Sequence, residues 1–238
     1  MQKKKSLRSL FLKNLIIVFL VPFMSILLVI CFYAYGQMTK ENEKRGAMYA
    51  SMLSNEIERK LEKYKEIVEM AADRAEVKSL DYTQAEPYLE HLAEIMSKEE
   101  WSYFTITNAY GTEQAHSEGM IGHGVSLRFE EAFLKPWEED ATVVCNPDFS
   151  KSTGRAVIGI STPIYRDERK VGVFIGYVWL ESVAEFLNNY KYTDSSYAFM
   201  MNADGTISAH PDESMVLNAT WDVSMEESKY LTSFTLIF

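Results

Sequence analysis

The amino-acid sequence predicts an α+β protein built on one antiparallel sheet, with an N-terminal transmembrane helix in front of it. Three observations predict this class. Residues 15–35 carry no charge, residues 41–79 have apolar side chains at spacings of three and four, and from about residue 101 the spacing changes to two. Spacings of three and four are typical of an amphipathic helix, whereas alternation is typical of half-buried strands.

The basic charge is concentrated in residues 1–14, which carry five Lys or Arg and no acid. The uncharged residues 15–35 follow, and as a helix they span about 31 Å, one hydrocarbon thickness. The run is longer than the core of a cleaved signal peptide and has no small-residue cleavage site. Because basic flanks stay in the cytoplasm, we expect a single-pass protein of the cell membrane, with its acidic bulk extracytoplasmic.

A long helix is predicted next, because residues 41–79 contain no proline and only one glycine, Gly46. We assign residues 37–80 to a stalk. In one interpretation its apolar stripe packs lengthwise on a single domain; in the other the stalk continues the membrane helix and carries homodimer contacts. The two interpretations are compatible. The stripe consists of Tyr49, Leu53, Ile57, Leu61, Tyr64, Val68, Ala71 and Ala75.

The remaining elements form one predicted lobe, residues 81–212. The spacing Thr83-x-x-Glu86 is that of a capping box and predicts a helix to about Lys98. Hairpins with helices to one side then make an α+β sheet. In chain order we predict strands at 102–107 and 112–117, a short helix near 129–136, strands at 141–145, 156–165 and 171–179, a helix at 181–189, and a last hairpin with strands at 197–202 and 206–210.

Composition and motifs exclude several functions. Of 238 residues, 47% are apolar and 24% charged, ordinary values for a folded chain, and two cysteines are too few for a disulfide scaffold. The formal net charge of −10 repels nucleic-acid phosphates. No phosphate loop, nucleophile elbow or histidine pair at zinc-site spacing occurs. We therefore expect no nucleic-acid partner, no catalytic or metal site, no cofactor and no enzymatic activity.

Four signatures between residues 101 and 212 carry a family resemblance. They are YFTITN at 103–108 with Gly111, SKSTGR at 150–155 with ISTPIY at 160–165, VGVFIG at 171–176 with Leu180, and SYAFMMNADGT at 196–206 with AHPD at 209–212. Their order, behind an anchor and a long helix, resembles the extracytoplasmic double-Cache (dCache) sensor domains of bacterial transmembrane receptors. Such receptors include methyl-accepting chemotaxis proteins, sensor kinases and diguanylate cyclases.

The resemblance implies two PAS-like lobes that share the long helix. Residues 81–212 would be the membrane-distal lobe, which binds a small extracellular solute, and residues 213–238 would begin the membrane-proximal lobe. The stalk would pass the signal to an output domain. That domain and a second membrane helix are missing from this sequence, so we expect a truncated sensor module. A membrane-anchored protein-interaction module without a small ligand is the alternative.

The resemblance also suggests site residues. Arg128 falls where amino-acid-binding members hold the ligand carboxylate, but acids replace their aromatic pair, Asp148 replaces their tyrosine, and Tyr177 replaces the ammonium-binding aspartate. An acidic, aromatic pocket would suit a cationic amine. In the alternative, the two acids at 130 and 131 lie on a solvated helix face and pair with Arg128 or Lys135. The candidates are Tyr103, Arg128, Glu130, Glu131, Asn146, Asp148, Tyr165 and Tyr177.

Overall fold

A computed structural model describes residues 7–119, 123–150, 153–188, 197–202, 204–220 and 234–237. Residues 1–49 and 50–238 form two compact units, which are treated separately below. Some predictions fall outside the described residues: the basic residues 3–5, the end of the helix at Asn189 and most of the segment from 221 onward.

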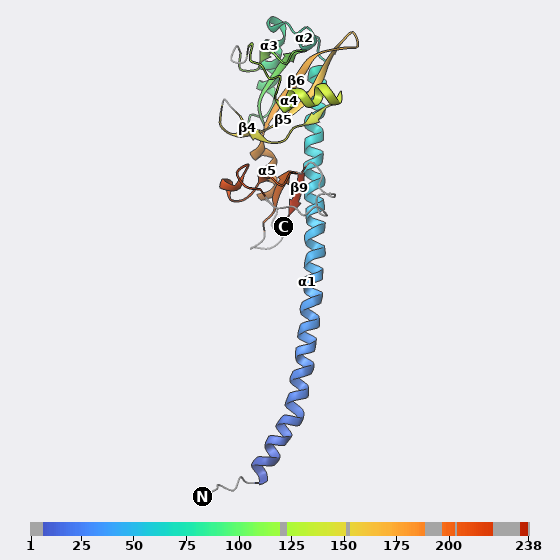
Figure 1. Cartoon of the computed structure of the whole chain (residues 1–238), viewed down its shortest axis with the longest axis vertical. Coiled ribbons are helices and arrows are strands. Elements are labelled where there is room, and N and C mark those ends of the chain that lie inside the picture. Colours follow the sequence, from blue (N-terminus) through green and yellow to red (C-terminus); the bar gives the residue numbers. More distant parts are fainter. Residues whose placement is uncertain are drawn as a thin grey trace. The chain divides into compact units, whose positions relative to one another are not determined.

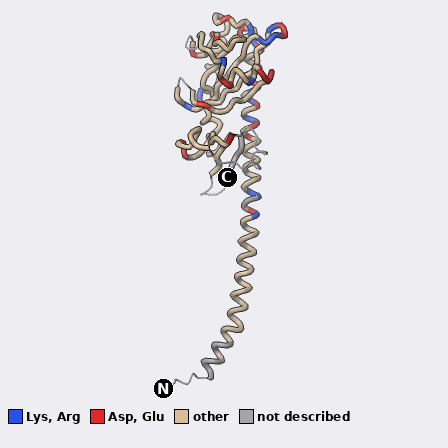
Figure 2. The backbone as a smooth tube through the Cα atoms, viewed as in Figure 1, with Lys and Arg blue, Asp and Glu red and all other residues tan. Residues whose placement is uncertain are grey.

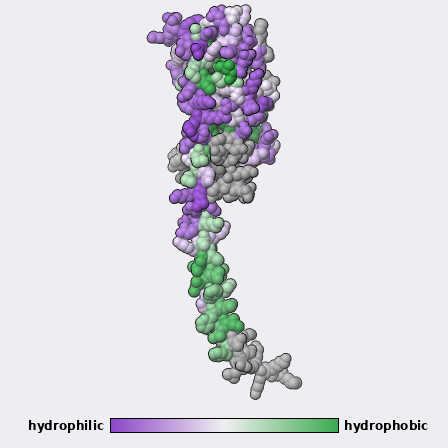
Figure 3. Space-filling model, turned by 180° about the vertical axis from the view of Figure 1, so that it is seen from behind, coloured by the Kyte–Doolittle hydropathy of each residue, from purple (hydrophilic) through white to green (hydrophobic). Residues whose placement is uncertain are grey.

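The first unit consists of the beginning of helix α1 (Leu7–Ala72). Its apolar side chains from Leu15 to Tyr35 are exposed all around the helix, and Figure 3 shows them as a hydrophobic band. Figure 2 shows no charged residue along the same stretch. Among the described residues this is the one helix long and apolar enough to cross a membrane.

In the second unit, the rest of α1 packs lengthwise on the sheet. Every predicted stripe position from Leu53 to Ala71 is buried, whereas Tyr49 is half-buried and Ala75 is exposed. The helix also ends earlier than predicted, at Ala72, and a separate short helix α2 (Ala75–Lys78) follows. The interpretation that the stripe packs on one domain is therefore confirmed for this part of the helix.

Helix α3 (Tyr82–Ile95) begins one residue before the predicted cap. Asp81 is the N-cap residue, and its side chain accepts hydrogen bonds from the Thr83 amide at 3.0 Å and the Thr83 hydroxyl at 2.8 Å. The prediction of Thr83 as the cap is wrong, because an aspartate two residues earlier satisfies the free amides of the first turn.

A six-stranded antiparallel sheet forms the main body of this unit (Figure 1). Its order is β2-β1-β6-β5-β3, with β4 also paired to β5. The β5–β6 turn uses Asp167 and Glu168, both at positive φ (50° and 60°), as a tight two-residue hairpin requires. The strands are β1 (Trp101–Asn108), β2 (Glu113–His116), β3 (Val143–Val144), β4 (Asp148–Phe149), β5 (Ala156–Arg166) and β6 (Arg169–Trp179).

Helices cover both faces of this sheet, not one face as predicted. The larger core joins one face to α1 and α3, with Val68, Leu89 and Phe104 fully buried in it. A second cluster on the other face contains Phe133 of helix α4 (Glu131–Glu139) and Ile175 of β6. Helix α4, with its proline, was expected. The face of the sheet that it covers depends on distant residues and not on the sequence of the helix itself.

The last predicted hairpin belongs to a second sheet. Helix α5 (Leu180–Asn188) leads away from β6, and β7 (Phe199–Asn202) then pairs with β8 (Ile207–Ala209) on one side and β9 (Phe234–Ile237) on the other. A short 3-10 helix, η2 (Glu213–Met215), follows β8. The hairpin itself was predicted, but its placement in the first sheet is wrong, because a strand from the end of the chain is its partner.

Candidate functional site

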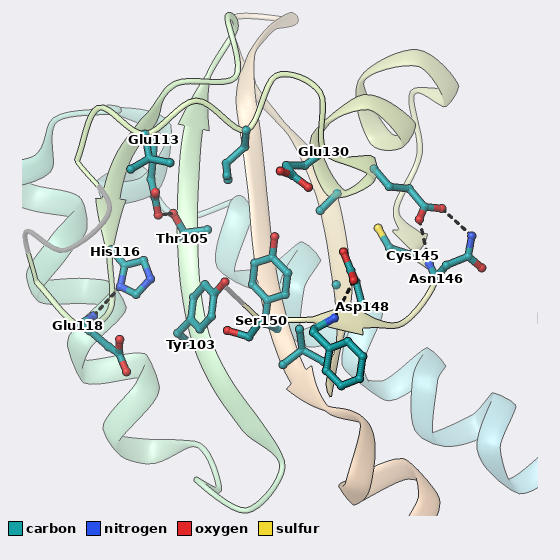
Figure 4. A pocket seen from close by; sticks show the side chains of 18 residues that line it. Tyr103, Thr105, Glu113, His116, Glu118, Glu130, Cys145, Asn146, Asp148 and Ser150 are labelled. Carbon is teal, nitrogen blue, oxygen red and sulfur yellow. Dashed lines mark hydrogen bonds between the residues drawn. The ribbon is translucent and has the colours of Figure 1, made fainter. Parts of the chain in front are cut away.

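A cavity of about 380 Å³ lies on the α4 side of the six-stranded sheet (Figure 4). Strands β1, β6 and β5 form its floor. Their register places Tyr177 of β6 beside Tyr103 on one side and Gly159 on the other. Gly159 leaves room there, because an added Cβ would lie 3.4 Å from Tyr177. The cavity thus crosses the middle of the sheet.

The lining is acidic. Among the described residues that line the cavity there is no lysine or arginine. At the rim, Glu131 is neutralised by Lys135 at 2.5 Å, and it accepts hydrogen bonds from the Asn146 amide and side chain, both at 3.2 Å. Five carboxylates contribute, those of Glu113, Glu118, Glu130, Glu131 and Asp148.

Glu113 is the buried member of this acidic group. It is 5% exposed, and its carboxylate accepts a hydrogen bond from the Thr105 hydroxyl. Burial raises the pKa of Glu113, while the Thr105 bond opposes this rise. A buried carboxylate without a cationic partner is costly when ionised, so an ammonium group in the cavity would favour its charged form.

An aromatic group occupies the middle of the cavity. The rings of Tyr103 and Tyr177 lie 4.6 Å apart between centroids, and His116 stacks on Tyr103 at 4.7 Å. The His116 Nδ1 accepts a hydrogen bond from the Glu118 amide at 3.0 Å. Burial lowers the pKa of His116 to about 4, so the imidazole is neutral at pH 7. Aromatic faces of this kind attract cations.

The structure brings most of the candidate residues together. Two do not line the cavity: Arg128 is exposed, with its guanidinium carbon 5.9 Å from the Phe129 ring centroid, and Tyr165 donates a hydrogen bond to Asp140 near the far end of β5. The candidates that line the cavity are Tyr103, Glu130, Glu131, Asn146, Asp148 and Tyr177.

Sequence reasoning missed Thr105, Glu113, His116 and Glu118, all of which line the cavity. Thr105 follows Tyr103 by two residues on β1 and faces the same side, so alternation could have identified it. His116 could have been inferred from its hairpin position opposite Thr105. Within the described part of the chain, no three His, Cys, Asp or Glu side chains are placed to hold a metal ion.

Comparison with known proteins identifies the family. A family model described as a Cache domain matches residues 35–236. The chain belongs to the Cache domain family. The resemblance to double-Cache sensor domains seen in the sequence is thereby confirmed.

Relatives of this Cache chain include chemotaxis receptors. The methyl-accepting chemotaxis protein PscA of Pseudomonas syringae pv. tomato is 34% identical over 76 residues, which are 32% of this chain and 12% of PscA. McpG of Pseudomonas putida is 27% identical over 126 residues, 48% of this chain and 20% of McpG. The matched region therefore spans a fifth or less of these receptors.

Solved structures show the same Cache fold. The ligand-binding domain of the Pseudomonas fluorescens chemoreceptor CtaA in complex with L-serine has a TM-score of 0.61 at 20% identity, covering 72% of this chain and 73% of that one. The ligand-binding domain of the Pseudomonas aeruginosa chemoreceptor PctC in complex with GABA has a TM-score of 0.54 at 22% identity, covering 71% and 75%. At these identities the likeness establishes the fold alone.

Proposed function

We propose that this chain is the membrane-anchored sensor part of a receptor for a small cationic amine. The observation that carries the proposal is the cavity itself, which combines five carboxylates with a central aromatic group and no described lysine or arginine. Carboxylates and aromatic faces are the groups that recognise ammonium ions in proteins. In this proposal the cavity binds the ligand and does not catalyse a reaction.

The ligand should lack a carboxylate. Ligands in the similar solved structures, such as L-serine and GABA, carry a carboxylate as well as an ammonium group. In this chain Arg128 is exposed and does not line the cavity. A ligand carboxylate would meet Glu113, Glu130 and Asp148 with no described guanidinium to hold it, and like charges at close range repel.

The membrane arrangement follows from charge. Residues 1–14 carry five basic side chains, so they remain in the cytoplasm, residues 15–35 cross the membrane, and the cavity lies outside. We assign residues 37–80 to the stalk, and we place the start of the second lobe at β7, because β7 pairs with β9 and not with the first sheet. Signalling through a chemotaxis-type output is part of the proposal for the whole receptor.

The test is thermal unfolding of the purified chain in detergent micelles with amines, amino acids and carboxylic acids. A ligand at 100 times its dissociation constant adds about 2.7 kcal/mol, which raises the unfolding temperature of a protein this size by roughly 5–10 °C. We expect a shift with amines only. A shift confined to amino acids would contradict the amine proposal. If no compound produces a shift, a protein-interaction module becomes the better explanation.

A further inference from the structure

The carboxylates of the cavity come from opposite edges of the sheet. Glu113 lies on β2, at one edge, whereas Asp148 lies on β4, which pairs with β5 near the other edge. Strands β1, β6 and β5 lie between them. Neighbouring strands are about 4.8 Å apart, so the two backbones are separated by roughly 19 Å across the sheet. Figure 4 shows the two side chains on opposite sides of Tyr103.

A single ammonium group is too small to serve both acids. A glutamate and an aspartate reach roughly 5 Å and 4 Å from their Cα atoms, which leaves a gap of at least about 10 Å, because the two residues also lie at different positions along the strands. An ammonium ion between two carboxylates spans only about 6 Å, because each N–O contact is about 2.8 Å. One positive group would therefore leave one end of the cavity without a partner.

The middle of the cavity suits a chain of methylene groups. Tyr103 and Tyr177 present their rings there, and Gly159 adds no side chain that would block the passage. The apolar side chain of Ala132, which lies 3.4 Å from the Cβ position of Gly159, completes this part of the lining. The cavity thus has an acid at each end, with the two tyrosine rings between them and Glu130 above the middle (Figure 4).

Glu113 and Asp148 are not neutralised by any residue that the structure describes. The side chain of Glu113 has Thr105 as its hydrogen-bond partner, and that of Asp148 accepts from the Phe149 amide at 2.7 Å. In the described part of the chain neither acid forms an ion pair with lysine or arginine. Glu113 is buried, and removing a charge from water without a partner is unfavourable, so a cation beside it would stabilise the site; at the exposed Asp148 a cation would gain a charge-assisted contact.

We propose that the ligand is a diamine, with one ammonium group held by Glu113 beside Thr105 and the other held by Asp148 on the side of Glu130. The proposal rests on the amine-sensor function and specifies its ligand class. The methylene chain between the two ammonium groups lies across the paired tyrosines. Glu113 and Asp148 then determine specificity, because each recognises a different end of the same molecule.

The experiment compares matched amines by isothermal titration calorimetry of the whole chain in detergent micelles. The pairs are n-butylamine with putrescine and n-pentylamine with cadaverine. We expect each diamine to bind about tenfold more tightly than its monoamine, since it makes one more charge-assisted contact. We expect E113Q and D148N each to remove this advantage.

Two controls make the result specific. Glu99→Gln changes an exposed acid away from the cavity and should preserve the diamine advantage. Unfolding of each unliganded variant checks the fold, and Asp148 is exposed, so D148N provides a test even if E113Q does not fold. Equal affinity for monoamine and diamine, or an unchanged advantage in D148N, would overturn the diamine assignment while the amine sensor stands. Binding of neither amine would overturn both.

Discussion

Glu113 faces the cavity because strand β2 is irregular. The pairing with β1 shifts between Ile106 and Thr107, so that Glu113 pairs with Thr107 while Ala115 pairs with Ile106. In a regular strand Glu113 would share a face with Ala115, which is buried in the larger core. A β-bulge re-aims one side chain in this way. This explains why alternation in the sequence did not identify the most buried acid of the site.

The raised pKa of Glu113 predicts how amine binding depends on pH. Its ordinary value is 4.5, and burial raises it. Above 4.5 but below the raised value, the empty cavity holds Glu113 protonated, and an ammonium ligand must displace that proton. Amine affinity should therefore increase as the pH rises through this window and level off above it. Calorimetry between pH 4.5 and pH 7.5 would measure this dependence.

Glu113→Gln is the control for that dependence. The variant cannot lose a proton at this position, so its affinity should be lower and should change less over the same pH range. His116 is neutral over most of this range, because burial lowers its pKa to about 4. An identical pH profile in both proteins would show that other acids of the cavity are responsible.

At the scale of elements, the close approach of β1 and β6 depends on Gly172. An added Cβ would lie 1.9 Å from the Thr107 carbonyl oxygen, which belongs to the backbone and cannot move aside alone. We expect Gly172→Ala to lower the free energy of unfolding by about 1–3 kcal/mol or more. Gly46→Ala is the matched control, since nothing lies within 4 Å of its Cβ position. Urea unfolding of both variants measures the difference, and equal stability would contradict this role.

A dimer formed through the predicted apolar stripe of the stalk must use residues before the packed part of α1. Leu53 to Ala71 are buried against the lobe, so their stripe is occupied. Met48 is 65% exposed and lies where the helix has left that core. In a chain with both native cysteines replaced by serine, Met48→Cys should form a disulfide-linked dimer in membranes. A product that stays monomeric under oxidation would contradict a parallel stalk dimer.

Local sequence patterns predicted the helices and strands better than they predicted which strands pair with one another. The stripe on α1 and the β5–β6 hairpin were predicted because spacing and turn chemistry are local properties. The β7–β8 hairpin was also found, yet its sheet was wrong, since its partner Phe234–Ile237 is distant in sequence. For the site, Glu130 and Asp148 were identified from substitutions at family positions. Arg128 was included because it falls at the family's carboxylate-binding position, but its side chain is exposed.

At the scale of the whole molecule, the charge pattern predicts which side of the membrane holds the cavity. Glu99 is exposed on the lobe, and Glu99→Cys would provide a reactive thiol there. In a chain lacking the native cysteines, a membrane-impermeant maleimide should label this position in cells whose inner membrane is intact. Labelling that requires disruption of the inner membrane would reverse the proposed topology.

Only one layer of backbone separates the cavity from α1. On β6, Tyr177 faces the cavity, while the adjacent Gly176 has no side chain and its Cβ position is 3.1 Å from Val68 of α1 and 2.6 Å from Trp101. At this point the side chains of Val68, Trp101 and Phe104 lie directly against the backbone of the strand. Since protein interiors have low compressibility, a ligand that displaces β6 also moves the surface on which α1 rests. Strand β6 thus forms the wall of the binding site on one face and contacts helix α1 on the other.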